Sequence, residues 1–226
     1  MKTLVIDVGG THVKILVSGK RQHLEFDSGP ILTAKAMVAG VKRATAQAGW
    51  TYEVISMGFP GPVLHNRPMA EPHNLGPGWV GFNFAKAFGR PIRIVNDAAM
   101  QALGGYKGGR MLFLGLGTGL GSALIVDSVL EPMELAHLPF KKGRTYEDFV
   151  GLKGLQRLGK KKWRKYVIEV MKLLRAATQA EYVVLGGGNA RLLKKLPPYA
   201  CQGDNANAFR GGFRLWQGKA AALLSR

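Results

Sequence analysis

Apolar and polar residues alternate in three stretches at the start of the chain, residues 3–8, 12–19 and 21–26. A two-residue period is typical of β-strands that bury one face. Short turns containing glycine separate the stretches, so the pattern predicts an antiparallel meander. A second set of three such stretches follows later, at residues 111–119, 120–127 and 128–135. The repetition predicts two related lobes.

Helical segments lie between and after these strands. The clearest is residues 161–178, where apolar residues recur at i, i+3, i+4 and i+7 and predict a buried stripe: Trp163, Tyr166, Val167, Val170, Met171 and Leu174. Other helices are predicted at 34–48, 83–89, 98–106, 145–159 and about 212–226, and further strands at 53–61 and 91–97. Residues 180–196 read as a strand, a glycine turn and a helix. A Gly/Pro-rich stretch up to residue 79 predicts a long loop, a type of segment that often carries binding groups.

Composition indicates a globular chain. It has 226 residues, 46% of them hydrophobic, but no apolar run approaches the roughly 18 residues that span a bilayer. The basic start turns to glycine too soon for a signal peptide, so a cytoplasmic location without membrane contact is expected. The single cysteine, Cys201, excludes an internal disulfide and any cysteine-cluster zinc site. Its expected state is a small, half-buried apolar residue.

Charge adds a possible partner. The chain has 32 Lys and Arg against 14 Asp and Glu, a net charge of +18. A positive field of this size attracts nucleic acid, an anionic membrane surface or a polyphosphorylated substrate. The basic residues gather in two runs, Lys141 to Arg144 and Gly159 to Lys165. The alternative is that both runs are only solvated surfaces.

Three glycine-rich loops each follow an apolar strand. They are Gly9-Gly10-Thr11, Gly115 to Gly121 (GLGTGLG) and Gly186-Gly187-Gly188-Asn189. Glycine lets backbone N–H groups approach an anion closely, so three such loops in a basic chain favour nucleotide or phosphate binding over plain tight turns. The spacing of the Walker A motif is absent, and so is that of the Rossmann motif. Neither of those nucleotide-binding folds is expected.

In order and spacing, four motifs together resemble the ROK family of sugar kinases in the actin and hexokinase superfamily. Asp7 to Lys14 resembles its first phosphate motif, Asn96-Asp97-Ala98-Ala99 its catalytic segment, Gly115 to Gly121 its second phosphate motif, and Gly186 to Asn189 its adenosine motif. Within the family, residues 144–151 (RTYEDFVG), 158–165 (LGKKKWRK) and 203–216 (GDNANAFRGGFRLW) resemble polyphosphate glucokinases, which also lack the zinc motif of other members. The resemblance implies an α/β chain with the two-lobed, actin-like ATPase (ribonuclease H-like) fold and a cleft between the lobes. The expected lobes are residues 1–98 with the closing helix 212–226, and residues 99–211.

Phosphoryl transfer to a sugar hydroxyl needs a base, a phosphate cradle and Mg²⁺. On this resemblance Asp97 is the expected base, although an aspartate there could simply cap a helix. Asp7 is the expected Mg²⁺ ligand, through water. The expected phosphate or nucleotide contacts are Gly9, Gly10, Thr11, Lys14, Gly117, Thr118, Gly119, Gly186, Gly187, Gly188 and Asn189. Lys14 could equally be a solvated strand residue.

The expected sugar contacts are Asn74, Asn96, Asp97, Glu134, His137 and Glu147. Glu134-x-x-His137 resembles the family's sugar-binding E-x-x-H, and Glu147 stands where the family has a further sugar-binding glutamate. The alternative for His137 is a buried histidine without sugar contact.

The sequence leaves the phosphoryl donor open between polyphosphate, ATP and both. It predicts a glucokinase-like kinase acting on glucose or a related hexose, with no structural zinc, no nucleic-acid partner and, by analogy with the family, a homodimer. The competing hypothesis is a non-catalytic protein on the same scaffold that senses sugar or binds a polyanion or nucleic acid.

Overall fold

The computed structural model describes residues 1–204 and 206–217, and the chain divides into two compact units. The first unit comprises Met1–Met100 and the stretch that begins at Ala208, and the second comprises Gln101–Asn207. Each unit is built around one five-stranded sheet. No described helix is both long enough and apolar enough to cross a membrane.

The sheet of the first unit has the order β3-β2-β1-β4-β7. Its strands are β1 (Thr3–Val8), β2 (His12–Val17), β3 (Leu24–Asp27), β4 (Val54–Phe59) and β7 (Ile92–Asn96). The first three form the expected antiparallel meander, while β1, β4 and β7 run parallel. Parallel strands end at the same edge of a sheet. The carboxyl ends of these three strands therefore gather the residues that follow them.

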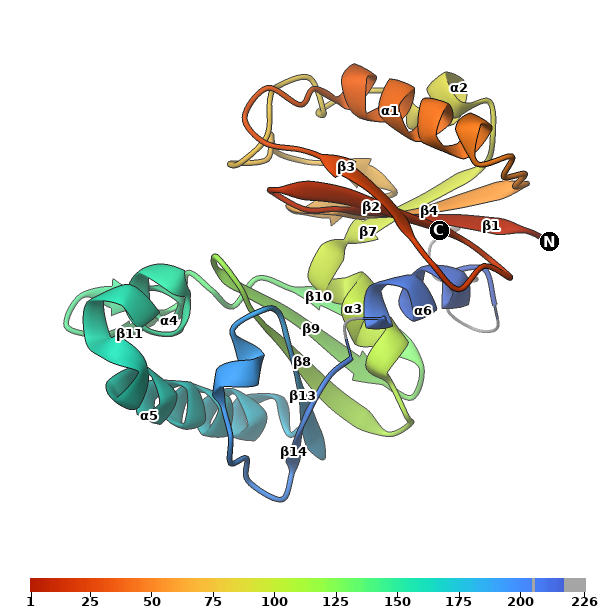
Figure 1. Ribbon diagram of the computed structural model, residues 1–226. Helices are drawn as coiled ribbons and strands as arrows, with labels where there is room; N and C mark the ends of the chain where they lie inside the picture. The colour runs from red at the N-terminus through yellow and green to blue at the C-terminus, as the bar shows by residue number, and fades with distance from the viewer. Residues whose placement is uncertain (205, 218–226) are drawn as a thin grey trace. The chain divides into compact units, whose positions relative to one another are not determined.

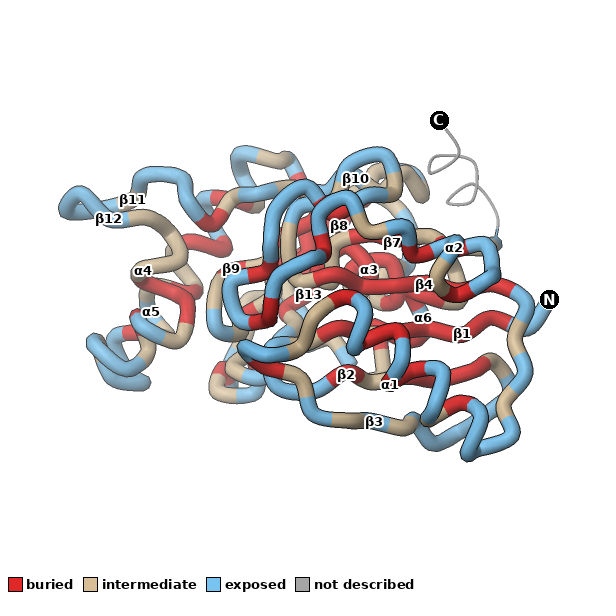
Figure 2. The backbone as a smooth tube through the Cα atoms, turned by 90° about the horizontal axis from the view of Figure 1, so that it is seen from above, coloured by how far each residue is buried: buried red, intermediate tan, exposed pale blue. Residues whose placement is uncertain are grey.

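Helices cover both faces of this sheet (Figure 1). α1 (Ala34–Gln47) and α2 (Phe84–Phe88) lie over the face whose side chains form one apolar core, which includes Ile6, Met57 and Trp79. α6 (Asn207–Arg214) lies over the other face, where a Cβ on Gly212 would come within 2.4 Å of Val5. Ser56 fixes that helix by donating to the Gly212 carbonyl at 2.5 Å. Figure 2 shows how completely β1, β2 and β4 are buried between these layers.

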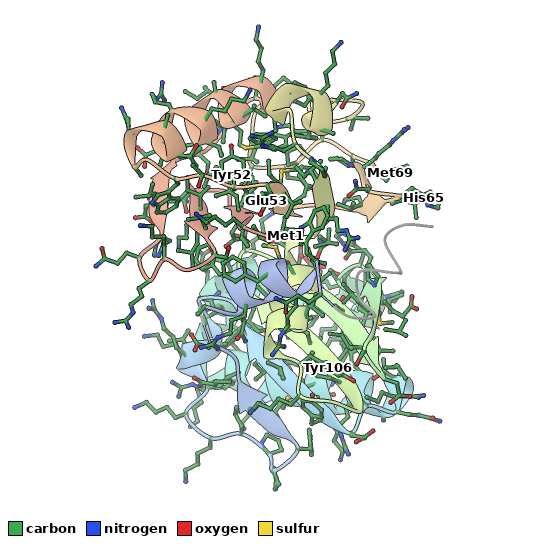
Figure 3. All side chains as sticks on the ribbon, turned by 90° about the vertical axis from the view of Figure 1, so that its right-hand side faces the viewer. Met1, Tyr52, Glu53, His65, Met69 and Tyr106 are labelled. Atoms are coloured by element: carbon green, nitrogen blue, oxygen red, sulfur yellow. The ribbon has the colours of Figure 1, made fainter. Side chains whose placement is uncertain are left out.

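β1 is also held at its start. The backbone N–H of Lys2 donates to the Glu53 carboxylate at 2.5 Å, and the amino group of Met1 lies 3.7 Å from it. Figure 3 labels Met1 and Glu53 at this end of the strand. The hydrogen bond from Lys2, aided by the charge of the chain terminus, lowers the pKa of Glu53. These contacts fix the strand that carries Asp7.

The second sheet repeats the topology of the first, with the order β10-β9-β8-β13-β14. β8 (Arg110–Leu116), β9 (Leu120–Val126) and β10 (Val129–Met133) form the meander, and β13 (Tyr182–Gly186) and β14 (Ala200–Gln202) add in parallel. The strand order of both sheets is a meander followed by two parallel strands. This shared order supports the expected repeat of a β-β-β unit.

One long helix provides the core of the second unit. α5 (Leu152–Thr178) packs Trp163, Val167, Val170, Met171 and Leu174 into an apolar cluster with β8 and β13. The expected stripe is thus confirmed, with Tyr166 half-buried at its margin. Gly159 interrupts α5 with φ +71°, so the helix is two segments joined at a kink. Before it come the hairpin β11 (Pro139–Lys141) and β12 (Arg144–Thr145), and then α4 (Tyr146–Val150).

Several local expectations differ from the structure. Residues after Asn189 form only a 3₁₀ turn, η1 (Ala190–Leu192), instead of a helix. Pro197 and Pro198 follow closely, and proline disfavours helical backbone in the residue before it. The stretch expected as an unstructured loop contains a small hairpin, β5 (Val63–Leu64) and β6 (Arg67–Pro68).

The last part of the chain also differs. Cys201 is exposed on the edge strand β14, a strand that the sequence pattern did not predict. The closing helix begins earlier than expected, at Asn207, and α6 ends at Arg214. Most of the segment 212–226, from residue 218 on, lies outside the described residues.

Candidate functional site

Two aspartates stand at the carboxyl edge of the first sheet. Asp7 is on β1 and is in register with Gly58 on β4, while Asp97 begins α3 (Asp97–Gly105) directly after β7. Because β4 lies between β1 and β7, Gly58 separates the two aspartates. A Cβ on Gly58 would lie 3.5 Å from the Asp97 Cα and 2.5 Å from the Met100 side chain. The glycine thus lets α3 start close against the sheet.

Gly58 is a residue that the sequence reasoning did not single out. A signal was present, because a glycine inside a strand pattern often marks the close approach of another backbone. Here the approaching backbone is the start of α3.

The Asp7 carboxyl group has a perturbed acidity. Its half-buried position on β1 removes it from water, and this desolvation raises its pKa from 3.8 to about 6, although the charge of Lys14 on the paired strand acts in the opposite direction. Lys14 is opposite Asp7 in the β1–β2 register and is half-buried. At neutral pH the carboxylate is charged in a site that disfavours that charge. Binding a cation there would relieve the penalty.

The first glycine turn joins β1 to β2. The Gly9 N–H donates to the His12 carbonyl at 3.0 Å, and Ser28 donates its hydroxyl to the Gly9 carbonyl at 2.6 Å. Asn74 packs against this turn, because a Cβ on Gly10 would lie 3.3 Å from the Asn74 Cβ. Thr11 is exposed at the tip. The structure thus brings one expected sugar contact, Asn74, next to the expected phosphate turn.

Asn96, not Asp97, caps α3. The Asn96 side-chain oxygen accepts from the N–H groups of Ala98 at 2.9 Å and Ala99 at 3.3 Å, and its amide donates to the Gly61 carbonyl at 3.0 Å. Asp97 is the first residue inside the helix, and its carboxylate accepts from the adjacent Ala98 N–H at 2.7 Å. The cap role is therefore filled by the neighbour. Asn96 has internal partners at both ends of its amide, so a sugar contact would have to use its remaining hydrogen-bonding capacity.

In the second unit the two other glycine loops meet. Gly117 to Gly119 form the turn between β8 and β9, and Gly187 to Asn189 follow β13, which pairs in parallel with β8. The Asn189 N–H donates to the Leu116 carbonyl at 3.0 Å, and its side-chain amide donates to the Gly117 carbonyl at 3.1 Å. Asn189 thus ties the loop expected to bind adenosine to the second loop expected to bind phosphate.

We expect Gly187→Ala to destabilise the protein by about 2 to 4 kcal/mol. Gly187 has φ +81°, and an added Cβ would lie 2.4 Å from the Leu116 carbonyl oxygen. Left-handed backbone costs an alanine roughly 1–2 kcal/mol and overpacking costs about 1–3 kcal/mol. Gly188→Ala is the matched control, because a Cβ there meets no atom within 4 Å. Urea unfolding of both variants measures the difference, and equal midpoints would contradict this account of the loop.

Glu147, an expected sugar contact, belongs to α4, and its carboxylate packs against the turn at Gly117 to Gly119. Its carboxylate accepts from the Leu120 N–H at 3.0 Å, and a Cβ on Gly119 would lie 2.2 Å from the same Oε2. α4 holds the residue in place through a capping box between Thr145 and Asp148. Glycine at 119 therefore makes room for the glutamate.

Glu134 and His137 lie between β10 and β11. Their side chains are 65% and 70% exposed, and Glu134 Oε1 is 4.0 Å from His137 Nε2. This exposure excludes the alternative of a buried histidine for His137. In residues 1–204 and 206–217 no three His, Cys, Asp or Glu side chains gather as they would around a protein-held metal.

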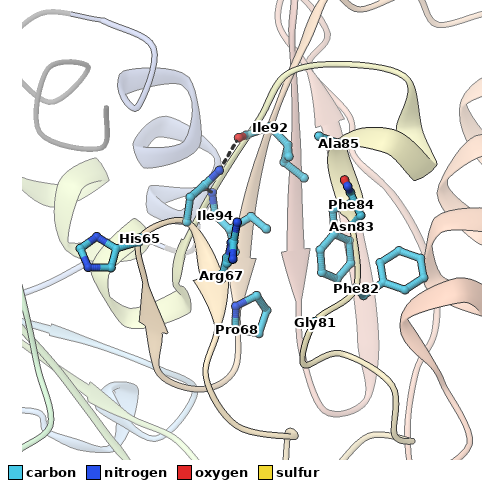
Figure 4. Close-up of a pocket in the computed structure, with 11 residues that line it drawn as sticks. His65, Arg67, Pro68, Gly81, Phe82, Asn83, Phe84, Ala85, Ile92 and Ile94 are labelled. Atoms are coloured by element: carbon cyan, nitrogen blue, oxygen red, sulfur yellow. Dashed lines mark hydrogen bonds between the residues drawn. The ribbon is translucent and has the colours of Figure 1, made fainter. Parts of the chain in front are cut away.

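The structure also has a cavity of about 420 Å³ away from all these residues, within the first unit (Figure 4). The β5–β6 hairpin, the loop with Phe82 and the edge strand β7 line it. Asn66 in the hairpin donates to the Ile92 carbonyl at 2.9 Å and accepts from the Ile94 N–H at 2.5 Å. Asn66 thereby supplies hydrogen-bond partners to backbone groups on the edge of β7, and these contacts give the hairpin a structural role.

Comparison with known proteins gives related sugar kinases. The chain is 28% identical to the polyphosphate glucokinase of Mycobacterium tuberculosis over 218 residues, which cover 85% of this chain and 80% of that protein. The structure matches the inorganic polyphosphate/ATP-glucomannokinase of Arthrobacter sp. strain KM with a TM-score of 0.79 and 21% identity, over 99% of this chain and 98% of that one.

A ROK family glucokinase from Streptomyces griseus, solved with glucose and AMPPNP, matches with a TM-score of 0.75 and 16% identity, over 93% and 97% of the two chains. These neighbours have the actin-like ATPase fold, which confirms the expected fold class. The model of the ROK family itself matches residues 3–131, more than half of the sequence. On that match, this chain belongs to the ROK family.

Proposed function

We propose that the protein is a hexose kinase that transfers a phosphoryl group from polyphosphate, ATP or both to the 6-hydroxyl of glucose or a similar sugar. The observation that carries the proposal is the pair Asp7 and Asp97, held on either side of Gly58 at one sheet edge. A sensor that binds sugar without chemistry needs neither a placed base nor a second carboxylate. The relatives named polyphosphate glucokinase, glucomannokinase and glucokinase support the same reaction class.

Asp97 is the proposed general base, which takes the proton of the attacking sugar hydroxyl. Its carboxylate starts α3, and the positive end of a helix dipole favours a charged carboxylate there. Because Asn96 supplies the cap, the fold does not depend on Asp97 for that purpose. The Asp97 carboxylate is thus proposed to act as the base at the start of a helix that its neighbour caps.

Asp7 is the proposed residue for Mg²⁺. Magnesium sites of phosphotransferases use one or two carboxylates together with waters and substrate phosphates, so a single carboxylate fits this ion. The raised pKa of Asp7 is the independent sign, because a carboxylate that is partly removed from water gains from a bound cation. When bound, the ion neutralises charge on the donor phosphates.

The glycine turns are the proposed phosphate cradle. Gly9 to Thr11 is the proposed phosphate-binding turn of the first unit, and the loops joined by Asn189 are the proposed phosphate-binding loops of the second. The proposed sugar contacts are Asn74, Asn96, Asp97, Glu134, His137 and Glu147. Asn74 is next to a phosphate turn and Glu147 is next to another, so sugar and donor groups would be bound side by side within each unit.

The test is product formation. Purified protein with glucose and Mg²⁺ is expected to form glucose 6-phosphate, with polyphosphate or ATP supplied as the only donor. The two donors are assayed separately, so the result also ranks them. No product from either donor with glucose, mannose or other hexoses, together with saturable glucose binding by calorimetry, would replace the kinase by the sugar-sensing alternative.

A further inference from the structure

We propose that inorganic polyphosphate is held along a basic surface of α5, which leads away from the second phosphate loop. The α5 basic surface consists of Lys153, Arg157, Lys160, Lys161, Lys162 and Lys165. The inference rests on the proposed kinase function and adds where the distal part of a long donor is bound.

The first step is that α5 starts on the phosphate loop itself. The N–H of Leu152, its first residue, donates to the Thr118 carbonyl at 3.1 Å. A Cβ on Gly151 would lie 2.9 Å from the same oxygen, so the contact is tight. If the terminal phosphate of a polymer occupies the loop at Gly117 to Gly119, its next phosphates therefore lie beside the first turn of α5.

The second step is that the cations of α5 point to solvent. Trp163 and its apolar neighbours are directed into the core, while Lys153, Lys160 to Lys162 and Lys165 are exposed. In residues 1–204 and 206–217, none of the six basic side chains has a carboxylate oxygen within 4.0 Å. Arg157 interacts electrostatically with Asp148, whereas the five lysines have no carboxylate partner within that distance among the described residues, so the lysine charges attract an external anion.

The third step is that the second basic run joins the same surface. Lys141, in the β11–β12 hairpin, forms an ion pair with Glu169 of α5, and its Nζ lies 5.6 Å from the Tyr166 ring centroid. Tyr166 is one helical turn after Lys162, so these contacts place the hairpin beside the lysines. Lys142 in the hairpin turn and Arg144 at the start of β12 follow, and both are exposed. Two runs that are separate in sequence therefore form one surface.

The fourth step decides between polyphosphate and nucleic acid. Proteins that bind single-stranded nucleic acid stack its bases on exposed aromatic rings. Trp163, within the lysine run, is fully buried and donates its indole N–H to the Val150 carbonyl. Phe140, Phe149 and Tyr166 pack against one another. Phe149 is buried, and Phe140 and Tyr166 are half-buried in this cluster. A charged surface whose neighbouring rings are packed against one another suits a phosphate polymer without bases.

The test uses the triple variant K160Q/K161Q/K162Q. We expect its KM for long-chain polyphosphate to rise roughly tenfold, and the slope of log KM against log salt to fall by about 2, as for three lost phosphate contacts. The KM for glucose and for ATP should stay unchanged. In the wild type, KM per chain should fall as polyphosphate is lengthened, and this dependence should weaken in the variant.

The matched control is K35Q/K42Q/K86Q, which removes three exposed lysines from α1 and α2 of the other unit. Its KM for polyphosphate should match the wild type. An equal rise in both variants would show an effect of net charge alone and overturn the proposal. So would a wild-type KM that does not depend on chain length.

Two further outcomes separate this proposal from others. An RNA oligonucleotide that competes with polyphosphate at lower concentration than polyphosphate itself would reassign the surface to nucleic acid. Product formation from ATP, without measurable polyphosphate binding in a direct titration, would overturn the basic surface and leave the kinase intact. Absence of product from every donor would instead overturn the proposed function.

Discussion

Asp97→Asn is expected to lower kcat for sugar phosphorylation by about 10²- to 10⁴-fold, the usual contribution of a general base. Asparagine keeps the size of the side chain and can still accept the hydrogen bond from the Ala98 N–H. It cannot take a proton from the sugar hydroxyl. The loss should therefore appear in kcat with either donor, while the KM for glucose changes little.

The structure also predicts that this variant folds normally. Asn96 caps α3, so the change at Asp97 leaves that cap in place, and the favourable charge that it removes at the helix start is worth about 0.3–1 kcal/mol. Asp127→Asn is a control with the same chemical change at an exposed turn of the second unit, where φ is +50°. Its kcat should equal that of the wild type. A kcat for Asp97→Asn within threefold of that control would remove Asp97 from the role of base.

Much of the fold could be predicted from the sequence because its strands alternate so regularly. The two meanders were visible as two-residue periods. The second segment of α5 was visible as an apolar stripe that begins at Trp163 and packs into the core. The order of the parallel strands was not visible. It depends on which strands pair across long connections, a property that no local pattern contains.

The missed elements have local causes. η1 and β14 lie in a segment of mixed signals. Its first residues, including Leu192 and Leu193, favour a helix, but the two prolines that follow disfavour one. Here β14 pairs with Val183 to Leu185 of β13, and that partner, distant in sequence, determines the strand. The β5–β6 hairpin likewise depends on Asn66, which bonds to the edge of β7.

The candidate site could be predicted as a set of motifs but not as an arrangement. Sequence spacing placed Asp7 near the end of a strand, and Asp97 and the glycine loops after strands, where the structure has them. It did not reveal Gly58 as the residue between the aspartates, or that Glu147 contacts Leu120. Both contacts depend on another element of the fold, which is β4 for Gly58 and α4 for Glu147. The roles of the site residues in binding remain predictions.

The second large effect is expected at Asp7, where activity and stability should change in opposite directions. Asp7→Asn should lower kcat by roughly 10²-fold or more, because the proposed Mg²⁺ site would lose its carboxylate. The same change should raise the free energy of unfolding at pH 8. Desolvation raises the Asp7 pKa from 3.8 to about 6 in the folded protein, so ionising it there costs up to about 3 kcal/mol.

The sign of the pH dependence follows from linkage. A carboxyl group with a raised pKa binds its proton more tightly in the folded state, so its contribution to stability is lost as pH rises from about 4 to about 6. Asparagine does not titrate. The gain of Asp7→Asn over the wild type should therefore be near zero at pH 4, grow through this window, and stay constant above it at up to about 3 kcal/mol, a figure that already includes the attraction to Lys14.

Urea unfolding at pH 4, 6 and 8 without Mg²⁺ measures this gain, with Asp27→Asn as the control because its side chain is 94% exposed. A variant that is less stable than the wild type at pH 8 would show that the Asp7 carboxylate stabilises the fold. Asp7 would then be a structural residue, and the argument that its burial indicates a cation site would fail. A gain in stability that grows between pH 4 and pH 6 would instead show that the Asp7 carboxylate destabilises the folded protein. Function then explains why the carboxylate is kept, since residues that cost stability persist where activity requires them.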